Sequence, residues 1–257
     1  MPATTTSTRC EPPPEPAVNE LGQRLRAKLV PIEPTVVERR AHGEHLLEVA
    51  CRSAMRFVGG DVVAVRVGGA AVGPVGTWRR YTIAGADDHT FRLLIERNPT
   101  GAAASFFDQL ERGSTMAVRG PAKPVLAPVG DDHLLIVTDL TGLATVEAVV
   151  HRESVSSAST DIRVAIVTGH SDVDISVVAD CWHAVPDTTV VRHTTVLRHA
   201  DQVVEWIDGR HRPGHRVLAI GGHELVALAR RTVADLERTP GRLRTHVYWK
   251  PGRRGLE

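Results

Sequence analysis

The sequence predicts a β barrel followed by an α/β domain, and three observations carry this prediction. Six short β-rich runs, separated by Gly, Pro and Asp turns, follow one another from about residue 35 to residue 119, which suggests a small antiparallel barrel. From residue 133 onward, continuous apolar strands alternate with helical segments, as in a parallel sheet. A chain of 257 residues also exceeds the usual size of one domain.

Composition places the domain boundaries. Met1 to about Val18 is rich in Thr, Ser and Pro and has few large apolar residues, so burial cannot offset the entropy lost on ordering. We therefore assign residues 1–22 to a disordered tail. The barrel is expected over residues 23–128, and the α/β domain over residues 129–257.

Individual elements follow from turn residues and from hydrophobic periodicity. The barrel is expected to contain one helix, Gly101 to Arg112, capped by Gly113. Its expected strands are Thr35 to Arg40, His45 to Arg52, Asp61 to Val67, Trp78 to Ile83, Phe91 to Arg97 and Thr115 to Arg119. The second domain is expected to contain strands His133 to Val137, Ile162 to Thr168, Thr188 to Arg192, Arg216 to Ile220 and Arg244 to Trp249, with helices Thr141 to Val150, Ala200 to Ile207 and Glu224 to Leu236.

Charge and cysteine content exclude several classes of function. The formal net charge of +1 gives no field that would gather nucleic acid or anionic lipid. Cys10, Cys51 and Cys181 lie far apart and form no Cys-x-x-Cys pair, which argues against zinc, an iron–sulfur cluster or a disulfide framework. No apolar run reaches about 18 residues, and the first segment lacks an export signal. We expect a cytoplasmic protein without a membrane span.

Motifs for metal-dependent or acyl-transfer chemistry are also missing. The chain has 13 histidines, but the clusters at His42 and His45 and at His211 and His215 lack the helical spacing of His-Glu-x-x-His. No Gly-x-Ser-x-Gly elbow or Ser-x-x-Lys pair occurs. We therefore expect no metal site and assign no residue as a catalytic acid, base or nucleophile.

The strand residues Arg79-Arg80-Tyr81-Thr82 combine the groups that a flavin nucleotide requires. A guanidinium binds phosphate, a phenol ring can lie against an isoalloxazine face, and a Thr hydroxyl or amide can reach a flavin nitrogen. Alternation places Arg79 and Tyr81 on one face of the strand and Arg80 and Thr82 on the other. A basic edge strand without a ligand shows the same four residues, so this pattern alone leaves both readings open.

A second candidate is the helix start at Gly101-Ala102-Ala103-Ala104-Ser105, with Arg97 nearby. Small residues let unpaired amides at a helix N-terminus approach a diphosphate, and they equally let a helix pack closely on a barrel. Two further runs lie at the carboxyl ends of expected parallel strands, where open sheets bind ligands, although Gly and Asp are also ordinary turn residues there. These runs are Asp139-Leu140-Thr141-Gly142-Leu143 and Gly221-Gly222-His223-Glu224.

The chain end places Tyr248 and Trp249 on a strand, followed by Lys250, Arg253 and Arg254. The two aromatic side chains can cover a flavin face, and the three cations can attract an anionic substrate. The alternative is a C-terminal strand whose charged end is solvated and binds nothing.

Taken in order, these motifs resemble the siderophore-interacting protein family of ferric-siderophore reductases, over about residues 30 to 254. The resemblance rests on Arg-x-Tyr-Thr, the Gly-led helix start, Gly120-Pro121 and the terminal Tyr-Trp-x-x-Gly. It implies a ferredoxin-reductase-like arrangement, in which an FAD-binding barrel precedes a nicotinamide-nucleotide domain and FAD passes electrons to siderophore-bound Fe(III).

Residue by residue, the resemblance assigns flavin binding to Arg79, Tyr81, Thr82 and Gly101, and cofactor contacts to Asp139, Thr141, Gly221 and Trp249. Several positions depart from the family pattern: Pro is Ala102, Ala103 is kept, Ser is Ala104, Trp is Phe106, and an Arg that follows Tyr-Thr is Ala84. The family's acidic residues are replaced by Leu140 and Gly222. Ser105 is left as the hydroxyl that could replace the missing Ser.

The resulting expectation is an FAD-dependent reductase that takes electrons from NAD(P)H or another donor and releases iron from a ferric chelate, with Lys250, Arg253 and Arg254 attracting the chelate. Two alternatives stay open. One is a flavin-binding protein whose nucleotide domain has become a docking module, and the other is a diaphorase for a protein redox partner. The sequence does not distinguish NADH from NADPH, name the siderophore or give the oligomeric state.

Overall fold

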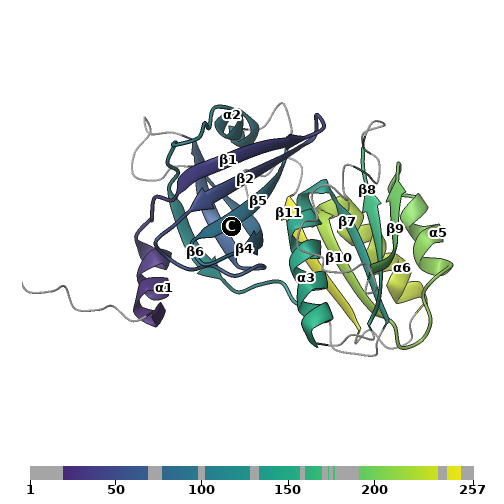
Figure 1. The fold of residues 1–257 in the computed structure, drawn as a ribbon. Helices are drawn as coiled ribbons and strands as arrows, with labels where there is room; N and C mark the ends of the chain where they lie inside the picture. The colour runs from purple at the N-terminus through teal and green to yellow at the C-terminus, as the bar shows by residue number, and fades with distance from the viewer. Residues whose placement is uncertain are drawn as a thin grey trace, which may run out of the picture.

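The computed structural model describes residues 20–68, 77–97, 102–127, 133–156, 160–169, 173, 176, 191–236 and 242–249. In this part of the chain, a six-stranded antiparallel sheet is followed by a five-stranded parallel sheet, and the two lie side by side in Figure 1. The predicted order of a barrel and an α/β domain is confirmed.

The first sheet closes into a barrel. Its strands lie in the order β1-β2-β5-β4-β3-β6, and bridges from Thr35 to Thr115 and from Ile32 to Val118 join its two ends. Alternate residues of each strand, such as Val63, Val65 and Leu93, point into one apolar core. The strands are β1 Thr35–His42, β2 Leu46–Arg52, β3 Val62–Gly68, β4 Thr77–Ala86, β5 Thr90–Glu96 and β6 Val118–Ala122.

The barrel differs from the sequence prediction at its two ends. Helix α1, Glu20–Leu29, was not predicted, and its first residues lie inside the segment assigned to the tail. Its surface is mostly polar, and it is held by burial of Ala27 and by an ion pair of 2.7 Å between Arg24 and Asp61. Strand β6 starts later than predicted and continues through Pro121, which its end position in the sheet order tolerates.

The predicted helix after β5 is shorter than expected. Helix α2 spans Ala102–Asp108, and Gly113 lies beyond it in a turn with a φ of 94°. The amide of Gly113 donates to the carbonyl of Val36 over 2.8 Å, so the chain returns to the barrel before another helical turn can form.

The second sheet is parallel throughout, in the order β11-β10-β7-β8-β9. Both faces are covered by helices, which explains the continuous apolar strands. Its strands are β7 His133–Asp139, β8 Asp161–Val167, β9 Val191–Leu197, β10 Arg216–Gly222 and β11 Leu243–Trp249. A 3-10 turn, Leu140–Gly142, leads into α3 Leu143–Ser156, and the other helices are α5 Gln202–Asp208 and α6 His223–Leu236. Strand β9 was predicted to start at Thr188, which lies outside the described residues.

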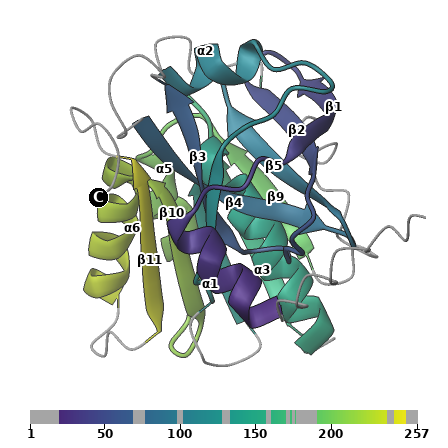
Figure 2. The ribbon, with the colours of Figure 1, turned by 90° about the vertical axis from the view of Figure 1, so that its left-hand side faces the viewer.

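The two helical layers have different neighbours. Leu134 and Ile136 of β7 pack toward α3, whereas Leu135 and Val137 pack toward α5 and α6. Figure 1 shows α3 between the barrel and the parallel sheet, and α6 packs on the opposite face of the sheet. Figure 2 views the molecule from the barrel side, with α1 in front and α6 at the left beside β11. None of the described helices is long and apolar enough to cross a membrane.

Helix α3 joins the two domains through a shared core and a buried ion pair. Leu46, Ala84 and Leu94 of the barrel belong to the same apolar cluster as α3 and β7. Glu147 of α3 is fully buried, and the Arg92 guanidinium of β5 lies 2.5 Å from its carboxylate. Arg92 also lies 3.6 Å from Glu48, so one guanidinium links strands β2 and β5 with α3.

We expect Arg92→Met to lower the free energy of unfolding by about 3–5 kcal/mol, because it leaves the Glu147 carboxylate buried without its cation. Urea denaturation measures this loss. The matched double variant Arg92→Met with Glu147→Leu removes both charges and should recover most of the stability. Equal stability of the single and double variants would contradict a buried ion pair.

Candidate functional site

A small cavity lies where the barrel meets the carboxyl edge of the parallel sheet. Its volume is about 140 Å³, and both domains contribute to its wall. The edge is the position at which open α/β sheets bind ligands. The lining residues are Arg79, Arg80, Tyr81, Thr82, Leu94, Glu96, Thr141, Ala144, Tyr248 and Trp249.

Strand β4 supplies four consecutive residues of this wall. Val65, whose side chain is in the barrel core, lies opposite Arg79, and Val62 lies opposite Thr82, so successive β4 residues alternate between the barrel interior and the second domain. Tyr81 packs edge-on against Phe107 of α2, with ring centroids 5.2 Å apart. Burial raises the pKa of Tyr81, partly offset by the Arg79 charge, and the phenol is therefore neutral at physiological pH.

Thr82 forms part of a buried cluster of three hydroxyls. Its oxygen lies 2.6 Å from the Tyr248 hydroxyl and accepts a hydrogen bond from Thr145 over 2.8 Å. Thr145 and Tyr248 also contact each other. The cluster therefore connects β4, α3 and β11 at the cavity. Thr82 and Trp249 were predicted as site residues, whereas Thr145 was not, because no local pattern distinguishes it from other helix residues.

Asp139 is buried beside the cavity and its carboxylate is held by several donors. It accepts hydrogen bonds from the Thr141 amide at 3.0 Å and the Gly222 amide at 2.7 Å, from the Thr141 hydroxyl, and from the Trp249 side chain. Burial raises the pKa of Asp139, and these hydrogen bonds oppose that rise. Gly221 has a φ of 135°, and a Cβ there would lie 2.6 Å from the Asp139 carboxyl group. Only glycine fits this position.

The structure explains the two missing acidic residues. Leu140 is 2% exposed and belongs to the apolar cluster under α3, where a carboxylate would be buried among hydrocarbon. A Cβ on Gly222 would lie 2.7 Å from the indole ring of Trp249. Trp249 therefore occupies the space that a side chain at position 222 would need. Ala84 is likewise buried at 2% exposure against this cluster, where an Arg has no room.

Glu96 is a cavity residue that the sequence analysis did not single out. It ends β5 on the same face as Arg92 and Leu94, toward the second domain, and lines the cavity together with Thr141 and Tyr248. Burial, and then the negative charge of Asp139, raises the pKa of Glu96 to about 7. The only sequence signal was a lone acid closing an apolar strand.

Of the residues expected to bind phosphate, Arg79 lines the cavity, whereas Arg97 and Ala103–Ser105 do not. The Arg97 guanidinium lies 3.0 Å from the Asp108 carboxylate and is not among the cavity-lining residues. Ala103 packs against the barrel core, Ala104 is buried, and Ser105 is exposed. For Ala102 only the backbone is described, as the first residue of α2, and Gly101 lies outside the described residues.

Lys250, Arg253 and Arg254 lie outside the described residues, so their assignment to substrate stays a prediction. Within the described ranges, no group of three or more His, Cys, Asp or Glu side chains has a geometry that could hold a metal ion.

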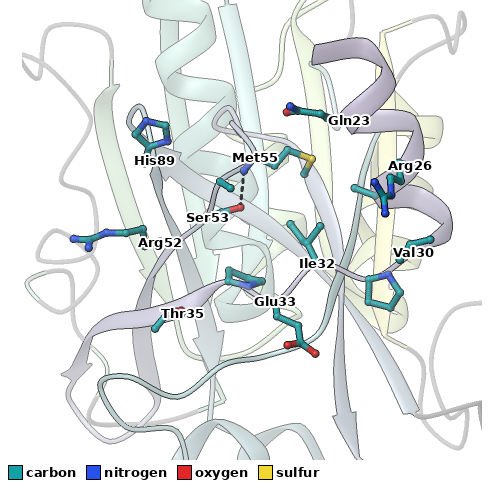
Figure 3. Close-up of a pocket in the computed structure, with 14 residues that line it drawn as sticks. Gln23, Arg26, Val30, Ile32, Glu33, Thr35, Arg52, Ser53, Met55 and His89 are labelled. Atoms are coloured by element: carbon teal, nitrogen blue, oxygen red, sulfur yellow. Dashed lines mark hydrogen bonds between the residues drawn. The ribbon is translucent and has the colours of Figure 1, made fainter. Parts of the chain in front are cut away.

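A larger cavity, of about 790 Å³, lies elsewhere on the barrel, between α1 and the end of β2. Figure 3 shows Ile32 and Met55 near its middle, with Arg26 and Arg52 on opposite sides. It contains none of the predicted site residues and does not reach the parallel sheet. We regard the smaller cavity as the functional site because polar groups from both domains converge there.

Comparison with known proteins supports the fold. No family model and no curated protein matches the sequence. The structure is similar to the siderophore-interacting protein of Acinetobacter baumannii, with a TM-score of 0.70 and 12% identity over 86% of this chain and 91% of that one. It is also similar to the siderophore-interacting protein SipS of Aeromonas hydrophila, with a TM-score of 0.69 and 18% identity over 87% and 93% of the two chains.

A third similar structure is the flavohemoglobin of Malassezia yamatoensis with bound FAD and heme, with a TM-score of 0.66 and 13% identity. The match covers 89% of this chain and 64% of that chain. At sequence identities of 12%, 18% and 13%, these three comparisons establish the fold and nothing beyond it. The chain has the fold of siderophore-interacting proteins, as the sequence motifs predicted.

The raised pKa of Glu96 predicts a specific dependence of stability on pH. Because the folded protein binds this proton more tightly than the unfolded chain, the stabilisation is present below pH 4.5 and is lost as the pH rises to about 7. Relative to Glu96→Gln, the wild type should lose up to about 3 kcal/mol over this range. Asp139 interacts electrostatically with Glu96, so the difference between the two proteins also includes the change in Asp139 titration that the substitution causes.

Urea denaturation of both proteins at pH 4.5, 6 and 8 measures this difference. Glu38→Gln, at an exposed position of β1, is the control and should leave the pH profile unchanged. Parallel pH profiles for the wild type and Glu96→Gln would show that Glu96 has an ordinary pKa.

Proposed function

We propose that this protein is an FAD-dependent reductase that passes electrons from a nicotinamide nucleotide to Fe(III) held by a siderophore or another chelator. Reduction to Fe(II) weakens binding by hard oxygen ligands and so releases the metal. The observation that carries the proposal is the cavity between Thr82 and the Tyr248-Trp249 pair, in a fold shared with siderophore-interacting proteins and with an FAD-containing flavohemoglobin.

The residues of the cavity fit a flavin ring. Leu94, Ala144 and the two aromatics provide apolar surface, whereas Thr82 and Glu96 provide polar groups for a ring edge. The volume of about 140 Å³ is below the roughly 300–1,000 Å³ of most ligand pockets. The Tyr248 hydroxyl, which contacts Thr82 and Thr145, and the Trp249 indole must therefore turn aside when the ring enters.

The proposed roles of the chain's own residues follow from their positions. Arg79 would hold a flavin phosphate, Thr82 would donate to a ring nitrogen, and Tyr81 would stay neutral beside the ring. Bound FAD supplies the step from a two-electron donor to one-electron acceptors. No protein acid or base is needed for outer-sphere transfer to iron. The amides at the start of α2 remain proposed diphosphate ligands, and Lys250, Arg253 and Arg254 remain proposed substrate contacts.

The residues expected to bind the nicotinamide nucleotide support a second candidate function. Asp139, Thr141 and Gly221 lie at the expected edge of the sheet, but Trp249 covers Gly222 and no acid lies at position 140 or 222. A protein that binds FAD but accepts no electrons from a nicotinamide nucleotide would have this arrangement. Such a protein would act as a binding or docking module.

One anaerobic experiment separates these candidates. The purified protein is loaded with FAD, NADH or NADPH is added, and the flavin absorbance in the visible range is followed. We expect bleaching by one of the nucleotides, and recovery of the absorbance with formation of Fe(II) when a ferric chelate is added, read with a ferrous-specific dye.

Bound flavin that neither nucleotide bleaches, but dithionite does, would support the binding module. Protein that does not take up FAD would contradict the proposed function as a whole.

We also expect Arg79→Ala to weaken FAD binding about 10- to 150-fold, because a charge-assisted pair worth roughly 1.5 to 3 kcal/mol is lost. Lys at this position should restore only part of the affinity, because it lacks the planar fork of guanidinium. Titration of the apoprotein with FAD measures the affinity. Arg26→Ala, an exposed cation beside the larger cavity, is the matched control. Unchanged affinity in a folded Arg79→Ala protein would remove Arg79 from the flavin site.

A further inference from the structure

The larger cavity, between α1 and the end of β2, has an apolar floor. Its volume of about 790 Å³ lies within the roughly 300–1,000 Å³ of most ligand pockets. Ala27 and Met55 belong to the barrel core, at 2% and 6% exposure, and Ile32 packs against the same core. Figure 3 shows Ile32 and Met55 between two cations, Arg26 and Arg52. The cavity therefore offers hydrocarbon contact along its floor and positive charge at both sides.

A buried hydroxyl and a histidine lie beside Arg52. Ser53 is 7% exposed, and its oxygen accepts a hydrogen bond from the Met55 amide over 3.0 Å. A hydroxyl is also a donor, and within the described residues no acceptor takes the Ser53 proton. The Ser53 amide donates to the His89 carbonyl over 2.8 Å, which holds the turn between β4 and β5 at the cavity. We call Arg52, Ser53 and His89, which lie on the same side of the cavity in Figure 3, the anion end.

The charges around this cavity favour an anionic ligand. In the part of the chain that the structure describes, neither Arg26 nor Arg52 has a carboxylate partner. Glu33 is the one acid among the described lining residues, and it is exposed. In Figure 3 its carboxylate lies on the opposite side of Ile32 from Ser53, so it leaves the anion end without a negative charge. Two guanidinium groups thus face the cavity against a single, distant carboxylate.

We propose that this cavity binds an amphipathic carboxylate with a straight alkyl chain, whose head lies at the anion end and whose chain covers Met55 and Ile32. A guanidinium binds a carboxylate through two parallel N–H donors, and the Ser53 hydroxyl adds a third donor. The chain gains affinity with each methylene that it buries on the apolar floor. The cavity contains none of the residues assigned to flavin, so this site is separate from the proposed function.

The test compares three probes that separate the head from the chain. The full-length protein, freed of bound lipid, is titrated calorimetrically with dodecanoate below its micelle concentration. Butyrate has the same head but too short a chain, and dodecyltrimethylammonium has the same chain but the opposite charge. We expect dodecanoate to bind at one site per chain, and each of the other two probes to bind about tenfold more weakly or worse.

Two variants test the residues. Arg52→Gln with Ser53→Ala removes donors of the anion end and should weaken dodecanoate binding about tenfold or more. Val30→Glu places a carboxylate on the α1 side of the cavity, at a position 51% exposed that the core does not need, and should also weaken it. The matched control is Arg40→Gln with Ser114→Ala, outside the cavity, where the Ser114 hydroxyl likewise accepts from a backbone amide. The control should bind like the wild type, and all three variants should keep the wild-type affinity for FAD.

Three outcomes would overturn the inference. The first is equal affinity for dodecanoate and dodecyltrimethylammonium, which would show that apolar surface alone binds them. The second is unchanged dodecanoate binding in the folded Arg52→Gln, Ser53→Ala protein, or an equal loss in the control. The third is the absence of dodecanoate binding. In that case, a dimer that sedimentation velocity detects and that Val30→Glu dissociates would assign the cavity to a second copy of the chain.

Discussion

The buried pair of Arg92 and Glu147 fixes the position of the barrel relative to the parallel sheet, and the candidate site depends on that position. A fully buried carboxylate on α3 requires a cation, and that cation comes from β5 of the other domain. The apolar residues beside the pair join the two domains in one core. Thr82 is thereby brought within hydrogen-bond distance of Thr145, at the edge where β7 and β10 end.

One departure from the family pattern, Gly222, leaves room for the side chain of Trp249. The ring lies against the backbone of Gly222, where a side chain would collide with it, and its N–H donates to Asp139. Asp139 also holds the Gly222 amide, so a single carboxylate from β7 organises this edge of the sheet. Glu96 lies close enough for this charge to raise its pKa. The acidic character of the site is thus supplied from β5 and β7 rather than from positions 140 and 222.

Sequence reasoning located the elements whose patterns are local. Alternation in β4 correctly separated Arg79 and Tyr81 from Arg80 and Thr82, and the apolar runs of β7, β8 and β10 reflect burial on both faces. Helix α1 was missed because the residue that it buries is the small Ala27, whereas its larger apolar side chains Leu25 and Leu29 are exposed, so no run of large apolar residues marks a core-facing side. Glu96 and Thr145 could not be assigned, because their environment is created by residues from distant parts of the chain. The shared cavity became visible only when β5, α3 and β11 were placed together.

The central claim is that the cavity between the hydroxyl cluster and Trp249 opens to receive a flavin ring. A crystal structure of the protein grown with FAD tests it most directly. The account predicts a ring bounded by Thr82, Glu96 and Ala144, with the Tyr248 hydroxyl moved away from Thr82 and a phosphate on Arg79. Flavin bound elsewhere, with the contacts among Thr82, Thr145 and Tyr248 intact, would contradict it.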